Sequence, residues 1–224
     1  MFGAVEGDVD GDLFGNVMGP VNGSIGGTIH GNIMGPVGGK ITGKVMGNIM
    51  GPVKGPVDGK VLGNIVGPCY GVGGEVRGNI MGMIHGGVNG RVMGNITGSV
   101  EGNVGGTING NIVGGINGGI SGTIEGNIVG SVLGDIKGTV RGNIGSKLTP
   151  DSNRIEGSIS GTVSGSIYAV VNGDVSGEIG SANGYRKCYV HEIRGNILEG
   201  AVIHGDVGRL HGKCFGIVEG RIYN

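Results

Sequence analysis

Hydrophobic and polar residues alternate along this chain with a period of four. Each unit reads G-x-[V/I]-x, with glycine first, a β-branched residue third and variable residues between them. Glycine stands at every fourth position from Gly3 to Gly67 and, after the shortened unit Gly71-Val72-Gly73, again from Gly74 to Gly142. In a strand, alternate residues share a face, so glycine and the apolar residue lie on one side. The pattern predicts continuous β structure, because a period of four drifts around a helical turn and glycine disfavours helix.

A second period, of sixteen residues, predicts how the β structure is arranged. Gly-Asn followed by Val or Ile recurs at this spacing, with one interval of fifteen across the shortened unit. Such a repeat indicates coils stacked one above another, each made of four tetrads. We therefore predict an all-β, single-chain, four-sided β-solenoid (β-helix) with ~16-residue coils and sides of about 13 Å. The asparagines are expected to form a stacked, structural amide ladder: Asn16, Asn32, Asn48, Asn64, Asn79, Asn95, Asn111, Asn127 and Asn143.

Glycine is expected at or near the corners of each coil, with one Val or Ile filling the interior on each side. A larger side chain or a restricted φ at a corner would block the bend. Ala169 takes a glycine slot in a later unit, and alanine is the next smallest residue.

The repeat divides the chain into four segments. Residues 1–145 form the regular solenoid, and 146–156 are an inserted loop of turn-forming and charged residues. Tetrads return over 157–180, and 181–224 are irregular C-terminal coils or a cap, with a second inserted loop over 181–192. This last segment is either a cap or a binding tip, and its candidate contact residues are Tyr185, Tyr189 and His191.

Composition and charge narrow the class of protein. Glycine provides 58 of 224 residues, but six prolines exclude collagen, and the abundance of Val and Ile argues against disorder. The 16 basic and 17 acidic residues nearly balance, which gives no sign of a nucleic-acid or membrane partner. Three cysteines argue against a disulfide framework, and no export signal precedes the repeat, so synthesis in the cytoplasm is expected.

Two kinds of repeat resemble this text. Gly15-Asn16-Val17 follows the small–Asn–apolar order of pentapeptide-repeat β-helices, although each unit here is one residue shorter. The G-x-V-x-G-x-V-x text is similar to the Gly/Val-rich repeats of phage tail fibres and spikes, which implies a virion structural protein. Those proteins include intertwined trimers, which remain the architectural alternative; the sixteen-residue register favours a single-chain coil. Bactofilins are a more distant likeness, with longer and less tetradic repeats.

The outward positions carry the candidate binding chemistry. One column holds Met18, Met34, Met50, Val66 and Met81, an apolar stripe that suggests lateral contact with another chain or, alternatively, packing against its own coil. The spacings of Cys188, His191, His204, His211 and Cys214 resemble zinc ligands, but Cys214 occupies an inward apolar slot, so no metal is expected. No catalytic motif or cofactor site is recognisable, and no enzymatic activity is expected.

These observations favour a structural subunit that assembles with other protein subunits, as a homo-oligomeric trimer or polymer. A phage virion tail or fibre component is the leading interpretation, with the virion as its final location. A bactofilin-like, polymer-forming cytoskeletal scaffold in the cytoplasm is the alternative. An ice-binding or adhesive solenoid is less favoured, because the best threonine column has only three successive members, Thr107, Thr123 and Thr139.

Overall fold

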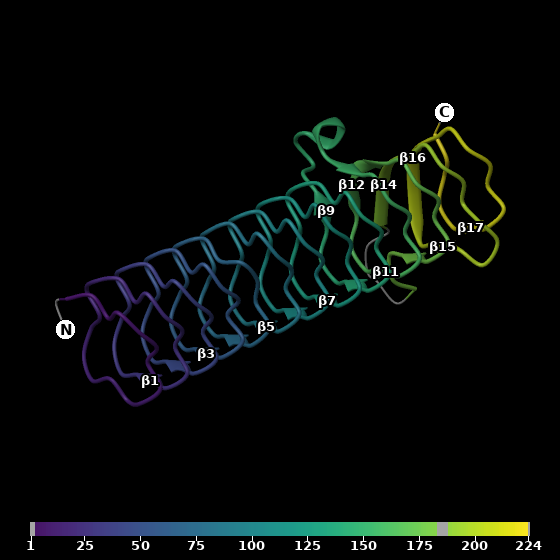
Figure 1. Cartoon of the computed structure of the whole chain (residues 1–224). Helices are drawn as coiled ribbons and strands as arrows, with labels where there is room; N and C mark the ends of the chain where they lie inside the picture. Colours follow the sequence, from purple (N-terminus) through teal and green to yellow (C-terminus); the bar gives the residue numbers. More distant parts are fainter. Residues whose placement is uncertain (1–2, 183–187, 224) are drawn as a thin grey trace.

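The computed structural model describes residues 3–182 and 188–223 and is an all-β solenoid of short parallel strands (Figure 1). One 12-stranded sheet runs along the stack. Its strands are β1 (Thr28–Ile29), β2 (Lys44–Val45), β3 (Lys60–Val61), β4 (Glu75–Val76), β5 (Arg91–Val92), β6 (Thr107–Ile108), β7 (Thr123–Ile124), β8 (Thr139–Val140), β11 (Thr162–Val163), β13 (Glu178–Ile179), β15 (Val202–Ile203) and β17 (Ile217–Val218). The predicted β-solenoid is confirmed, whereas its four-sided outline stays a prediction.

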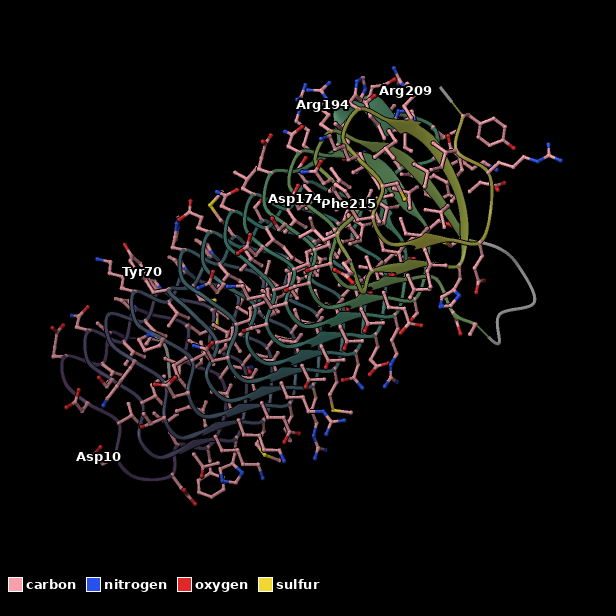
Figure 2. The ribbon with its side chains drawn as sticks, turned by 90° about the vertical axis from the view of Figure 1, so that its right-hand side faces the viewer. Asp10, Tyr70, Asp174, Arg194, Arg209 and Phe215 are labelled. Atoms are coloured by element: carbon pink, nitrogen blue, oxygen red, sulfur yellow. The ribbon has the colours of Figure 1, made fainter. Side chains whose placement is uncertain are left out.

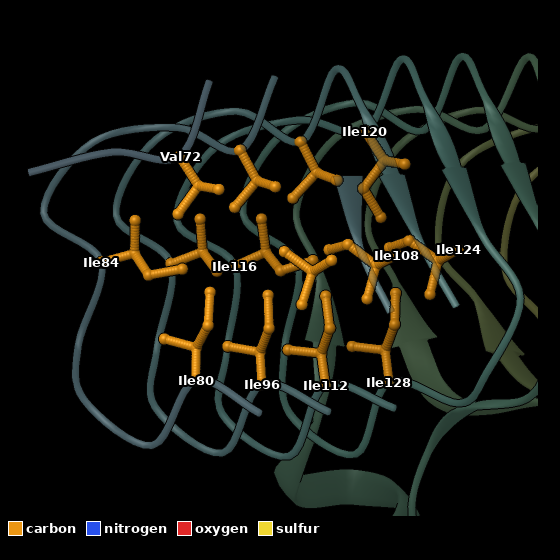
Figure 3. Close-up of a cluster of buried hydrophobic side chains, with 14 of the residues drawn as sticks. Val72, Ile80, Ile84, Ile96, Ile108, Ile112, Ile116, Ile120, Ile124 and Ile128 are labelled. Atoms are coloured by element: carbon orange, nitrogen blue, oxygen red, sulfur yellow. The ribbon is translucent and has the colours of Figure 1, made fainter. Parts of the chain in front are cut away.

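The sixteen-residue period is the register of the stack. Thr28 pairs with Lys44, and the inward residues form parallel bridges at the same spacing. Figure 3 shows one such column, in which Ile80, Ile96, Ile112 and Ile128 lie one above another, each fully buried. Every regular coil contributes four residues of this kind, so the interior is a continuous apolar core whose burial is the main favourable contribution to folding.

The glycines are required by the close approach of successive coils. A Cβ atom on Gly94 would lie 2.5 Å from the backbone oxygen of Gly78, and one on Gly47 would lie 2.6 Å from that of Gly31. Among the described glycines, positive φ occurs only at Gly15, Gly71, Gly145, Gly180 and Gly200. The expectation that a restricted φ selects glycine is therefore wrong for most positions, where contact with the neighbouring coil selects it instead.

A second, five-stranded sheet begins where the repeat becomes irregular. It comprises β9 (Ile144–Gly145), β10 (Arg154–Ile155), β12 (Ile167–Val171), β14 (Cys188–Ile193) and β16 (Gly205–Leu210). The first inserted loop contains a 3-10 turn, η1 (Pro150–Ser152), and projects beside β9 and β12 in Figure 1. The chain rejoins the stack at β10, where Ile155 bridges Val132 of the preceding coil.

The second predicted loop, 181–192, is partly wrong. Its last residues belong to β14, which is six residues long and pairs with β12 and β16. Alternation of buried and less buried residues over Cys188–His191 is the strand pattern that reading this segment as a loop overlooked. Tyr185 lies outside the described residues.

Candidate functional site

The asparagine column forms hydrogen bonds along the regular stack. From Asn32 to Asn143, each backbone N–H donates to the side-chain oxygen of the asparagine one coil earlier, at 2.7–2.9 Å. Up to Asn127, each side-chain amide also donates to that oxygen, at 3.0–3.4 Å. The oxygens are thereby satisfied within the stack, which makes the column a device for coil spacing and leaves little capacity for a ligand.

The predicted apolar stripe is exposed along its length. Met18, Met34, Met50, Val66 and Met81 have exposed fractions between 37% and 49%, so they do not fold back onto their own coils. The column continues as Thr97, Val113 and Val129, all exposed. Two residues after each member, across a glycine, comes a second outward column: Pro20, Pro36, Pro52, Pro68, Met83, Ser99, Gly115 and Ser131.

Together with the asparagines, these columns make an uncharged face. We call it the lateral face and define it by eight coils of three residues each, from Asn16-x-Met18-x-Pro20 to Asn127-x-Val129-x-Ser131. None of these described positions carries a charged side chain, whereas Lys44, Lys60, Glu75 and Arg91 follow one another in a single column elsewhere on the same coils. An uncharged, partly apolar surface of this length is typical of a contact with another macromolecule.

A separate group of polar residues lies on the five-stranded sheet beside the first inserted loop. Tyr189 and His191 are on β14, with the Tyr168 ring of β12 centred 6.1 Å from that of Tyr189. Lys147 and Pro150 of the loop complete the lining of an open pocket of about 420 Å³. Of the predicted contact residues, Tyr189 and His191 therefore face the protein's own loop as well as solvent.

Charged residues next to this pocket bind one another. His191 Nε2 lies 2.8 Å from Asp151 Oδ1, and Arg209 Nη2 lies 3.2 Å from the same oxygen and 3.1 Å from Glu192 Oε2. Figure 2 shows Arg209 and Arg194 at one edge of the molecule, and Arg194 Nε is 2.8 Å from Glu192 Oε1. These contacts fasten the loop to β14 and β16.

The pKa values of the two carboxyl groups follow from these neighbours. The hydrogen bond from Arg194 is the largest cause lowering the pKa of Glu192, with further lowering by the charges of Arg209 and His211, although its side chain is only 4% exposed. The hydrogen bond from His191 is the largest cause lowering the pKa of Asp151. Both carboxylates are therefore ionised and paired at neutral pH. Sequence reasoning missed this cluster because Asp151 and Arg209 are far apart in the chain.

The residues with zinc-like spacing do not gather at one place. His204 lies between Glu178 and Glu219, His211 is near Glu192, and the Cys214 side chain is exposed although it aligns with inward Ile197. Burial raises the pKa of the Cys188 thiol to about 11, so it carries no charge at neutral pH. A different trio in the described chain, Asp151, His191 and Glu192, has ligand atoms close enough for a cation, but Arg209 already neutralises both carboxylates there.

The threonine column is one residue longer than the sequence indicated. Thr107, Thr123 and Thr139 on β6, β7 and β8 are followed by Thr162 on β11, because the inserted loop leaves the sheet register intact. Arg91 and Glu178 bound the four threonines.

Comparison of this chain with protein-family models, with curated proteins and with solved structures finds no match in any of the three. Among the described residues there is no helix of the length and hydrophobicity needed to cross a membrane.

Proposed function

We propose that this protein is a structural subunit: a solenoid rod that assembles laterally with other protein subunits. The observation that supports this proposal is the lateral face, which stays free of charge over eight successive coils while the same coils bear charged residues elsewhere. Such a face is at a disadvantage in water and gains free energy when another surface covers it. A virion tail or fibre component is the form favoured by the sequence resemblance, with the virion as its location.

The experiment compares the native protein with a variant whose lateral face is charged. Met34→Lys, Met50→Lys and Met81→Lys together place three charges on outward positions of the face. The matched control, Thr107→Lys with Thr123→Lys and Thr139→Lys, adds the same charge to the 12-stranded sheet. Lysine already occupies this column at Lys44 and Lys60, so the control is expected to fold.

Extracts of cells that make each form at its natural level are fractionated by size. Wild type and control are expected in particles far heavier than one chain, and the lateral-face variant in lighter fractions. A wild-type chain that migrates alone, or a charged face that changes nothing, refutes the assembly role. Electron microscopy of the heavy fraction distinguishes the two forms: virion particles support the leading form, and filaments support a cytoskeletal scaffold.

A further inference from the structure

We propose that two copies of this chain pack antiparallel through their lateral faces, about a two-fold axis between the coil of Val66 and the coil of Met81. This inference rests on the proposed function and names the partner. It follows from the spacing, the bulk and the rim charges of the face.

The spacing of the face favours a partner built like this chain. Neighbouring coils are joined by parallel β bridges, so their outward residues recur about every 4.8 Å along the stack. Eight such coils extend over about 34 Å. Only a surface with the same repeat keeps its ridges between those of the lateral face over this distance, and a second copy provides it.

The bulk of the face changes from one half to the other. The first three coils present Met18, Met34 and Met50 with prolines beside them, whereas the last three present Thr97, Val113 and Val129 with Ser99, Gly115 and Ser131 beside them. In an antiparallel pair, the protruding half of each copy meets the low half of its partner. A parallel pair about a two-fold axis along the rod places methionine opposite methionine at one end and small residues opposite small residues at the other, which leaves a gap.

Charges at the rim agree with the antiparallel arrangement. The column next to the prolines contains Lys54 three coils from one end of the face and Glu101 three coils from the other. The two-fold axis therefore brings Lys54 of each copy opposite Glu101 of its partner, giving two equivalent contacts. Within the described part of its own chain Lys54 has no ion-pair partner, while Glu101 Oε2 contacts His85 Nδ1 at 3.0 Å. The same axis places Tyr70 opposite His85.

The opposite rim contains no conflict. It brings exposed Met46 opposite exposed Met93 and leaves no like charges facing each other. The three central columns measure about 34 by 13 Å, so two copies cover roughly 900 Å² there. The rims add to this area and bring the total toward the 1,200–2,000 Å² of a stable interface.

Charge reversal tests the arrangement in the purified full-length protein. Sedimentation equilibrium is expected to give twice the mass of one chain for the wild type. Lys54→Glu and Glu101→Lys are each expected to weaken the dimer about tenfold, because each creates two like-charge contacts. The double variant restores opposite charges and is expected to recover the dimer. Lys44→Glu on β2 is the matched control and is expected to dimerise as the wild type does.

Cross-linking tests the direction independently. In a Cys214→Ser background, which removes the exposed thiol, Met18→Cys and Val129→Cys chains are mixed and treated with a short thiol cross-linker. The mixture is expected to give a covalent dimer, and each variant alone is not. Cross-linking of Met18→Cys with itself indicates a parallel pair and overturns the proposal, as does failure of the double charge variant to recover. A monomeric wild type also overturns it, but the assembly role stands if native extracts still hold the chain in heavy particles.

Discussion

Removing one amide from the asparagine column tests how much the ladder stabilises the stack. Asn95→Ala deletes the oxygen that accepts the Asn111 backbone N–H at 2.8 Å and the Asn111 side-chain amide at 3.1 Å. It also deletes the longer, 3.4 Å bond from the Asn95 amide to Asn79. Each lost hydrogen bond is worth about 1 kcal/mol, and the half-buried N–H of Asn111 is left without a partner. The expected loss in free energy of unfolding is about 2–4 kcal/mol.

The variant series separates the ladder from side-chain size. Asn95→Asp keeps an acceptor for the Asn111 N–H, as Asp135 does for Ser158 and Asp174 does for Asn196, so it should lose less than the alanine variant. Asn109→Ala is the control, because this exposed asparagine makes no described side-chain hydrogen bond, and its effect should stay within about 0.5 kcal/mol.

Two measurements assess the result. Chemical denaturation reports the whole chain, and hydrogen exchange at the Asn111 amide reports the local opening, which matters because stacked repeats need not unfold in one step. Equal stability of Asn95→Ala and Asn109→Ala, with unchanged exchange at Asn111, would refute the view that the ladder holds the coils.

Three further predictions concern the core, the glycines and pH. Ile112→Asp should unfold the neighbouring coils by burying an unpaired carboxylate, whereas Ile112→Val should cost about 0.5–1.5 kcal/mol; wild-type-like melting of the aspartate variant contradicts the inward assignment. Gly94→Ala should lower the melting temperature because its Cβ meets Gly78, whereas Gly7→Ala, with open space around it, should not. Contact with Glu219 first, and then with Glu178, raises the pKa of His204, so this stabilisation is complete below the ordinary histidine pKa and disappears as pH rises through the raised value. Hydrogen exchange at Ile203 should therefore quicken with rising pH, and Glu219→Gln should flatten that dependence.

The regular part of the fold was predictable because each local choice repeats. Spacing alone identifies the columns of Ile112 and Asn95, since a residue that recurs every sixteen positions has the same neighbours in every coil. Even the shortened unit was visible, and the structure accommodates it at Gly71, where φ is +155°. What repetition hides is the reason for glycine: contact with the next coil and restriction at a corner predict the same sequence.

The C-terminal cluster was not predictable because it depends on pairing between dissimilar segments. Glu192 lies opposite Arg209 in the β14–β16 register, and Asp151 reaches both strands only because the first inserted loop returns over them. No periodic text connects these residues. The signal that was available is local, namely the alternation in β14, which gives a strand but not its partners.

The same register bears on how the lateral face should be interpreted. The asparagine column is explained by its hydrogen bonds, but nothing in the backbone requires Met50 or Val66 to be uncharged. Outward columns elsewhere on the same coils accept Lys60, Glu75 and Arg91 without disturbing the β pairing. The methionine and proline columns stay uncharged over eight coils although the solenoid tolerates charge, so the restriction comes from outside the fold. A surface that another chain covers imposes such a restriction, because a lone charge buried there would lose its hydration without gaining a partner.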